Sequence, residues 1–288
     1  MKKFDGILIC SDIDGTIFYQ PKAESEEKGY IPENVCRAIR YFQENGGRFT
    51  LATGRFPKYA RRRLSRYLTP NAPLVTLNGA VIYDAENDIE LFTRSISDDI
   101  ARLSYDVLER YTTIARLDLQ CADNCSLNIT RTDRGYKYVN ALDPDDKYHF
   151  IGSREEFLRD FSDKKVYKIL YFVTDEESDR LKEMIASDFP EYAVARSWKN
   201  GVELQCADAD KGSSTRRLAD MLGDVRLLVC AGDFENDITM LKSADVGYAV
   251  NDARENVKAA ADRITAATCK EGAMEEIIRD IEKEFGLD

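Results

Sequence analysis

The 288-residue chain contains a single histidine, His149. Zinc sites usually combine several histidines or cysteines, and a Ser-His-Asp hydrolase needs a histidine as its base, so the sequence disfavours both kinds of site. We interpret His149 as a surface residue. The sequence also has no apolar run of about 18 residues, the length that a membrane-spanning helix requires. Residues 7–10 form an apolar stretch that is too short for a secretory leader. We therefore expect neither a membrane-spanning helix nor a secretory leader.

Basic residues are fewer than acidic residues. Lysine and arginine number 41 against 52 aspartates and glutamates, which gives a formal net charge of −11 at pH 7. An acidic surface repels nucleic-acid phosphates and anionic lipids, so we expect neither nucleic acid nor membrane as a partner. The seven cysteines are scattered and odd in number, which favours a reducing cytoplasmic location. The composition is otherwise that of a globular protein, and nothing in it indicates an oligomeric state.

Short apolar runs that end in polar or glycine-containing turns are present near both ends of the chain. Several are followed by a segment with the 3.6-residue apolar period of a helix, such as the one that begins at Pro32. Alternating strands and helices with nearly continuous apolar strands predict a parallel sheet covered on both faces. The predicted strands cover residues 6–10, 48–52, 74–77, 226–231 and 246–250.

The middle of the chain has a different pattern. One helix is predicted over residues 100–108 and another around residues 181–185, among strands that alternate apolar and polar residues. Asn200-Gly201 predicts a hairpin turn. We therefore predict an α+β domain over residues 85–206, inserted into an α/β domain formed by residues 1–84 and 207–288. The acidic segment 21–29 is predicted to be a solvated loop.

Polar side chains follow four of the predicted strands. If these strands are parallel neighbours, the polar residues meet at the carboxyl edge of the sheet, where ligands of open α/β sheets collect. Several carboxylates crowded at one place repel one another, and oxygen ligands without histidine or cysteine favour Mg²⁺. The residues at these strand ends are Asp12, Asp14, Thr53-Gly54-Arg55, Asn78, Asp233, Asn236 and Asp237.

Asp12 and Asp14 are spaced to address one site from a strand end. One can act as a nucleophile and the other as a general acid and base, provided that their environments separate their pKa values. A pair of turn or helix-capping aspartates is the alternative interpretation of this short pattern. An EF-hand fits less well, because the glycine follows too early in the loop.

Two further motifs can hold an anion. Thr53-Gly54-Arg55 combines a hydroxyl, a flexible backbone and a guanidinium, and Lys211 precedes a predicted helix, where it can neutralise a phosphate. Each has a simpler alternative, a turn in the first case and a solvated lysine in the second. Cys121 and Cys125 have the spacing of one helix face, and we interpret them as core or surface thiols rather than as zinc ligands.

Five motifs together carry a resemblance that none carries alone: Asp12-Ile-Asp-Gly-Thr16, Thr53-Gly-Arg55, Asn78-Gly-Ala80, Lys211-Gly212 and Gly232-Asp-x-x-Asn-Asp237. Their order closely resembles the haloacid dehalogenase-like hydrolase superfamily, in particular its Cof-type sugar-phosphatase branch. The resemblance implies a Rossmann-like, doubly wound parallel core with an inserted α+β cap. It also implies Mg²⁺-dependent phosphoryl transfer to an aspartate, and a cap that closes to exclude water and to select the leaving group.

The resemblance further implies a role for each matched residue. Asp12 matches the nucleophile and a Mg²⁺ ligand. Asp14 matches the general acid and base, with its backbone carbonyl directed to the metal. The other matched residues are implied as phosphate contacts (Thr53, Lys211, Asn236), as a metal ligand and its supporting carboxylate (Asp233, Asp237), and as cleft-lining groups (Gly54, Arg55, Asn78).

The leading hypothesis is therefore a phosphatase that acts on a small phosphorylated metabolite, with a sugar phosphate as the first candidate. A sugar phosphomutase uses the same first step and returns the phosphoryl group to a sugar. A non-catalytic protein that binds a metal or phospholigand and regulates a partner is the alternative from another class, although a pure binder has no need of both Asp12 and Asp14.

Overall fold

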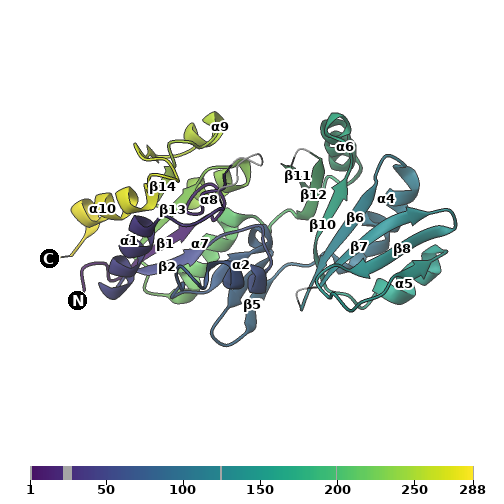
Figure 1. Cartoon of the computed structure of the whole chain (residues 1–288), viewed down its shortest axis with the longest axis horizontal. Helices are drawn as coiled ribbons and strands as arrows, with labels where there is room; N and C mark the ends of the chain where they lie inside the picture. Colours follow the sequence, from purple (N-terminus) through teal and green to yellow (C-terminus); the bar gives the residue numbers. More distant parts are fainter. Residues whose placement is uncertain (1, 22–27, 124, 199, 288) are drawn as a thin grey trace. The chain divides into compact units, whose positions relative to one another are not determined.

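The computed structural model describes residues 2–21, 28–123, 125–198 and 200–287 (Figure 1). Residues 22–27 of the predicted acidic loop, and Lys199 beside the predicted hairpin turn, lie outside these ranges. The chain divides into two compact units, one formed by Met1–Phe92 with Asp210–Asp288 and the other by Thr93–Ala209. In the described residues, no helix has the length and hydrophobicity needed to cross a membrane.

The first unit is built on a five-stranded parallel sheet with the strand order β15-β14-β13-β1-β2. β1 lies between β2, which is an edge strand, and β13, so the chain reverses its direction of winding on the two sides of β1. This topology confirms the predicted α/β class and Rossmann-like core. The strands are β1 (Ile7–Ser11), β2 (Arg48–Leu51), β13 (Leu227–Gly232), β14 (Val246–Ala249) and β15 (Arg263–Ile264).

Helices cover this sheet because alternate strand residues point to opposite faces. Leu8 and Cys10 of β1 belong to a buried cluster with residues of α7 and α8. α1 carries a buried stripe, which includes Val35 and Ile39, and it lies beside α10 (Figure 1). The helices of this unit are α1 (Glu33–Glu44), α2 (Pro57–Leu64), α7 (Lys211–Leu222), α8 (Ile238–Ser243), α9 (Glu255–Lys258) and α10 (Ala273–Phe285).

A second, three-stranded sheet of β3 (Leu74–Thr76), β4 (Val81–Asp84) and β5 (Ile89–Thr93) completes the first unit. A parallel bridge between Ala52 and Val75 joins it to the main sheet. The boundary between the units therefore falls at the end of β5. The sequence had predicted this boundary after Asp84. The reason is that β5 follows β4 in the same sheet, which keeps residues 85–92 with the first unit.

The second unit is an α+β structure with a seven-stranded sheet in the order β11-β12-β10-β6-β7-β8-β9, antiparallel throughout. Helices α3 to α6 contribute to one buried apolar cluster with this sheet. Its strands are β6 (Arg116–Cys121), β7 (Cys125–Thr132), β8 (Gly135–Asn140), β9 (His149–Ile151), β10 (Val166–Phe172), β11 (Tyr192–Trp198) and β12 (Gly201–Cys206). The helices are α3 (Ile100–Leu103), α4 (Tyr105–Arg110), α5 (Arg154–Phe161) and α6 (Asp175–Asp188).

Two local expectations in this unit are wrong. The predicted helix over residues 100–108 is divided at Ser104, whose φ of −121° and ψ of −74° are not helical. Cys121 and Cys125 do not share a helix face, because they face each other across the β6–β7 hairpin. His149 is exposed, as predicted, and stacks on Tyr138 with a ring-centroid separation of 4.8 Å.

Candidate active site

The centre of the candidate site is the edge of the main sheet where β1 and β13 end. These strands pair in parallel, with Ser11 opposite Ala231, so the residues that follow them emerge side by side. The backbone N–H of Asp12 donates to the carbonyl of Ala231 at 2.9 Å, which continues the ladder by one residue. The topology thus brings Asp12 close to the turn that carries Asp233, as the sequence predicted.

Lys211 connects the carboxylates of this edge. Its Nζ donates to Oδ1 of Asp12 and to Oδ1 of Asp237, at 2.6 Å in both cases. The side chain is fixed because Lys211 is the first residue of α7, whose N-cap Asp210 accepts hydrogen bonds from the N–H groups of Gly212 and Ser213. Only 1% of Lys211 is exposed, so its charge acts with little screening by water.

Asp237 supports the site with both of its oxygens. Oδ1 accepts from Lys211, and Oδ2 accepts from the backbone N–H groups of Asp233 and Phe234, both at 3.0 Å. These bonds fix the turn after β13 in the shape that presents Asp233. A contact of Asp237 with a metal ion stays a prediction.

Burial changes the ionisation of the cluster. Burial raises the pKa of Asp12 to about 7, although the adjacent Lys211 ammonium opposes this change. Burial and the negative charges of Asp12 and Asp237 raise the pKa of Asp233 to about 8. Burial also lowers the pKa of Lys211, but the two carboxylates outweigh it and hold that pKa above its ordinary value. The site therefore favours additional positive charge.

The donor set suits a hard divalent cation. Asp12, Asp233 and Asp237 each place a carboxylate oxygen within 4.8 Å of the others. Oδ1 of Asp233 accepts from the Thr16 hydroxyl at 2.7 Å. Oδ2 of Asp12 and of Asp233 has no hydrogen-bond partner within the described ranges. Oxygen donors of this kind are those that Mg²⁺ prefers, so the residues present fit this ion.

Gly15 gives these carboxylates room. Its φ is +92°, which other residues rarely adopt, and a Cβ built on it would lie 2.4 Å from Oδ2 of Asp233. The backbone of the first motif therefore approaches the carboxylate more closely than any side chain would permit.

Asp14 lies in a separate set of contacts. Its Oδ2 accepts from Nε of Arg55 at 2.6 Å, and its Oδ1 accepts from the side-chain amide of Gln20. Arg55 also lies over the ring of Tyr59, 5.1 Å from its centroid. The carboxylate of Asp14 is not part of the acidic cluster, so a contact of Asp14 with a metal through its backbone carbonyl stays a prediction.

The other predicted phosphate-binding residues lie on neighbouring turns. Asn236 donates from its amide to Oδ1 of Asn78 at 3.1 Å. Asn78 in turn donates its backbone N–H to the carbonyl of Thr53, and the Thr53 hydroxyl accepts from the N–H of Arg55 at 3.3 Å. Gly54 lies between Thr53 and Arg55 in this turn. The structure thus brings the predicted residues of three motifs into one connected network.

Sequence reasoning missed three residues of the site: Thr16, Gln20 and Asp210. Thr16 belongs to the first motif, but the sequence assigned it no role. Asp210 precedes Lys211 at the start of a predicted helix, and an aspartate at that position is typical of a helix N-cap. Gln20 carried no such signal, because its contact with Asp14 depends on the way residues 15–19 turn back: the N–H of Gly15 donates to the carbonyl of Phe18.

Comparisons with known proteins identify the family of the chain. The family model described as haloacid dehalogenase-like hydrolase matches residues 9–277. The 5-amino-6-(5-phospho-D-ribitylamino)uracil phosphatase YitU of Bacillus subtilis is 22% identical over 285 residues, which cover 97% of this chain and 98% of the relative.

Solved structures have the same fold. TM0651 from Thermotoga maritima superposes with a TM-score of 0.73 at 21% identity, over 98% of each chain. The subclass IIB sugar phosphatase BT4131 superposes with a TM-score of 0.66 at 21% identity, over 95% of this chain and 98% of that chain. At these identities the two structures establish similarity of fold.

Proposed function

Because this chain belongs to the haloacid dehalogenase-like hydrolases and is a phosphatase, we propose that it hydrolyses a small sugar phosphate with Mg²⁺, through a phosphoryl group carried on Asp12. The observation that carries the proposal is the buried contact of Asp12 with Lys211 next to Asp233 and Asp237. The names of YitU and BT4131 support a hydroxyl-rich phosphorylated metabolite as substrate. The cytoplasmic location and the absence of nucleic-acid and membrane partners stay predictions.

In the first step a carboxylate oxygen of Asp12 attacks phosphorus, and the bond from phosphorus to the ester oxygen breaks. Asp14 gives a proton to the departing oxygen, so that an alcohol leaves. Lys211 favours the ionised form of Asp12, against the effect of burial, and supplies fixed positive charge to the phosphoryl oxygens. Thr53 and Asn236 supply neutral hydrogen-bond donors for the same oxygens.

In the second step water attacks the phosphorus of the aspartyl phosphate and Asp14 takes up a proton from that water. The bond between phosphorus and the Asp12 oxygen breaks, which releases inorganic phosphate and regenerates the carboxylate. Arg55 and Gln20 hold Asp14 during both steps. Asp12 and Asp233, with Asp237 in support, would hold Mg²⁺, which would supply Lewis-acid stabilisation of the phosphoryl charge.

The test is phosphate release from a panel of sugar phosphates by protein that was stripped with EDTA and then supplied with MgCl₂. We expect release that depends on Mg²⁺, and an Asp12→Asn variant should lose at least about 10³-fold in kcat. Acid quenching followed by mass spectrometry should find a phosphoryl group on the peptide that contains Asp12. Full Mg²⁺-dependent activity in a folded Asp12→Asn variant would refute the proposed nucleophile.

The same panel of compounds separates the alternatives when isomerised sugar phosphate and binding are measured alongside free phosphate. A sugar phosphomutase would form isomerised sugar phosphate faster than free phosphate, and a non-catalytic binder would bind a phosphorylated metabolite tightly without turning it over. The paired Asp12 and Asp14 favour an enzyme over a binder, since a binder has no use for a separate acid and base.

A further inference from the structure

Two cysteines of the second unit face each other where β6 and β7 meet. Cys121 is the last residue of β6 and Cys125 is the first residue of β7, and they are directly opposite in the antiparallel ladder. Opposite residues of such a ladder have Cα atoms about 4.5–5.5 Å apart, within the range of about 4.4–6.8 Å that disulfides span. Both cysteines are free thiols. The backbone therefore already has the spacing that a disulfide between them requires.

Hydrogen bonds fix the backbone on both sides of this pair. The N–H of Ala122 donates to the carbonyl of Lys165 at 2.8 Å, and the N–H of Cys125 donates to the carbonyl of Ala122 at 3.2 Å. Cys121 also lies opposite Val166 of β10, so its strand is paired on two sides. The pair thus belongs to the ordered sheet, and oxidation would join residues that the sheet already holds side by side.

The two thiols differ in exposure and in ionisation. Cys125 is half-buried, whereas only 3% of Cys121 is exposed. A hydrogen bond from the Cys121 thiol lowers the pKa of Cys125, and the Lys164 ammonium lowers it further, against burial and the charges of Asp146 and Asp123. The same hydrogen bond, together with burial, raises the pKa of Cys121. Cys125 therefore has the features of an attacking thiolate, and Cys121 those of a protonated neighbour.

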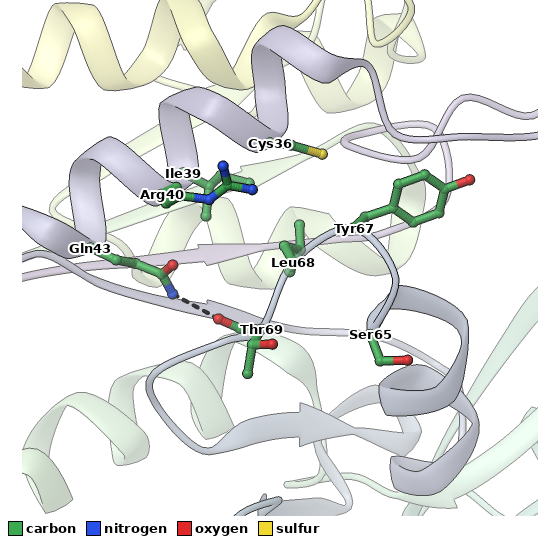
Figure 2. Close-up of a pocket in the computed structure, with 8 residues that line it drawn as sticks. All are labelled: Cys36, Ile39, Arg40, Gln43, Ser65, Tyr67, Leu68 and Thr69. Carbon is green, nitrogen blue, oxygen red and sulfur yellow. Dashed lines mark hydrogen bonds between the residues drawn. The ribbon is translucent and has the colours of Figure 1, made fainter.

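Cys36 of α1 is a half-buried thiol without this arrangement (Figure 2). It lies beside a surface hollow, and none of the other residues labelled in Figure 2 is a cysteine. Burial raises the pKa of Cys36, although the charge of Arg40 opposes this change. Partial burial by itself thus does not favour a thiolate in this chain. The neighbouring thiol is what distinguishes Cys125 from Cys36.

We propose that Cys121 and Cys125 form a reversible redox-modification site, at which a hydroperoxide converts the two thiols into a disulfide. This site lies within the second unit and is additional to the phosphomonoester site at Asp12. A sulfur that is oxidised alone can proceed to sulfinic and sulfonic acids, which are not readily reversed. The adjacent Cys121 stops Cys125 at a stage that ordinary thiols can reduce.

The reaction has two steps. The Cys125 thiolate attacks one oxygen of the peroxide and the O–O bond breaks, which leaves a sulfenic acid on Cys125. The departing hydroxide combines with the proton that Cys125 released on ionising and becomes water. The Cys121 sulfur then attacks the Cys125 sulfur, the S–O bond breaks, and a second water leaves with the Cys121 proton. The two sulfurs together lose two electrons, and the peroxide gains them.

The wild-type protein provides the first test. Reduced protein is treated with hydrogen peroxide, its remaining thiols are blocked with N-ethylmaleimide, and it is digested with trypsin. Cleavage after Arg116 and Arg131 gives one peptide that contains both cysteines. We expect this peptide to lose two hydrogen atoms and to take up no N-ethylmaleimide, unless dithiothreitol is added first.

Two internal controls accompany this measurement. The pair should react at least about threefold faster than Cys36, since a tenfold larger thiolate population is partly offset by lower nucleophilicity. Protein unfolded in urea should form the same disulfide at least about threefold more slowly, because the fold no longer lowers the pKa of Cys125. Both comparisons use the unaltered chain, so they hold even if a serine variant fails to fold.

Serine variants assign the role of each thiol. Cys121→Ser should leave a sulfenic acid on Cys125 that dimedone traps, because the second step has lost its thiol. Cys125→Ser should slow the oxidation of Cys121 at least about threefold, since the remaining thiol is buried and protonated. Cys36→Ser is the matched control and should form the disulfide at the wild-type rate.

Each result bears on the proposal. A reversible disulfide within the peptide, formed faster than Cys36 is oxidised and dependent on Cys125, supports it. Oxidation of Cys36 before the pair, disulfides only between molecules, or equal rates in folded and unfolded protein would overturn it. An unchanged rate of Cys121 oxidation in Cys125→Ser would do the same. None of these readouts uses phosphate release, so the outcome is independent of the proposed enzymatic activity.

Discussion

Both units bury a lysine side chain, and the two lysines have different surroundings. In the second unit, Lys168 of β10 donates to Glu203 of the adjacent β12 at 3.0 Å. In the first unit, Lys211 donates to both Asp12 and Asp237, and Asp233 lies close to them. Burial is nearly the same, at 2% exposed for Lys168 and 1% for Lys211.

The balance of charge, and not burial, distinguishes these two places. A buried pair of one cation and one anion compensates its own charges, and it is a common structural feature. A buried cluster of three carboxylates around one ammonium keeps an excess of negative charge, which a proton or a metal ion must offset. Burial raises the pKa values of Asp12 and Asp233, and the negative charges of the neighbouring carboxylates raise them further.

The largest expected effects come from removing each lysine. Lys211→Met and Lys168→Met each leave buried carboxylates without their cation, so each should lower the free energy of unfolding by about 3–5 kcal/mol. Only Lys211→Met should also abolish phosphate release per folded molecule, since it removes charge at the phosphoryl group. Urea unfolding and phosphate release measure the two quantities. A comparable loss of kcat in Lys168→Met would break the distinction between the units.

We expect Mg²⁺ to stabilise the first unit and not the second. At a concentration of 100 times its Kd, Mg²⁺ should raise the free energy of unfolding of the first unit by about 2.7 kcal/mol, because it binds only the folded site. Asp233→Asn should remove this increase, whereas Lys168→Met should retain it. Thermal unfolding in EDTA and in MgCl₂ measures the difference. An equal increase in wild type and Asp233→Asn would show that Mg²⁺ binds elsewhere.

Two glycines with positive φ allow a matched comparison. Alanine at Gly135 of the second unit would place Cβ 2.3 Å from the backbone oxygen of Ile151, and alanine at Gly15 would place it 2.4 Å from Oδ2 of Asp233. Each costs about 1–3 kcal/mol in backbone strain. We expect Gly135→Ala to lose more thermal stability, because backbone must move, and Gly15→Ala to lose more phosphatase activity. The opposite order for either quantity would contradict the proposed role of Asp233.

The smallest effect expected is a change in the pH dependence of stability without metal. An aspartate in the unfolded chain titrates near 3.8, whereas Asp12 and Asp233 titrate at about 7 and about 8 in the folded chain. Between about pH 4 and 8 the folded state holds more protons from these groups, so their contribution to stability decreases as pH rises. In EDTA the free energy of unfolding of the Asp233→Asn variant should therefore decrease less over this pH range than that of the wild type. Urea unfolding at several pH values measures both. Parallel curves for the two proteins would count against the raised pKa of Asp233.

The sequence was most informative at strand ends. Apolar runs followed by acidic or glycine-containing turns predicted the parallel sheet, and its carboxyl edge then required Asp12 and Asp233 to meet. That inference works because parallel strands share one direction, so a single rule places residues that are far apart along the chain. The rule did not place Lys211, which precedes a predicted helix and whose role was implied by the resemblance to the family.

Contacts that depend on the path of a loop could not be predicted from the sequence. The hydrogen bonds from Arg55 and Gln20 to Asp14 require the backbone to turn back at Phe18, and no periodic pattern records such a turn. Cys121 and Cys125 show the same limit, because a spacing of four residues fits a helix face as well as a short hairpin. The position of β5 depended on which sheet accepts its backbone hydrogen bonds, a matter of tertiary structure.

The separation of Asp12 from Lys211 by 199 positions has a consequence for biosynthesis. At about 5–20 residues per second, a ribosome needs about 10–40 s to travel from one to the other. All of Thr93–Ala209 is translated in that interval. The second unit can therefore fold before β13 is synthesised and pairs with β1. A nascent chain therefore carries Asp12, the proposed nucleophile, well before Lys211 and Asp233 are synthesised, so the proposed site cannot form until the final strands of the first unit have emerged.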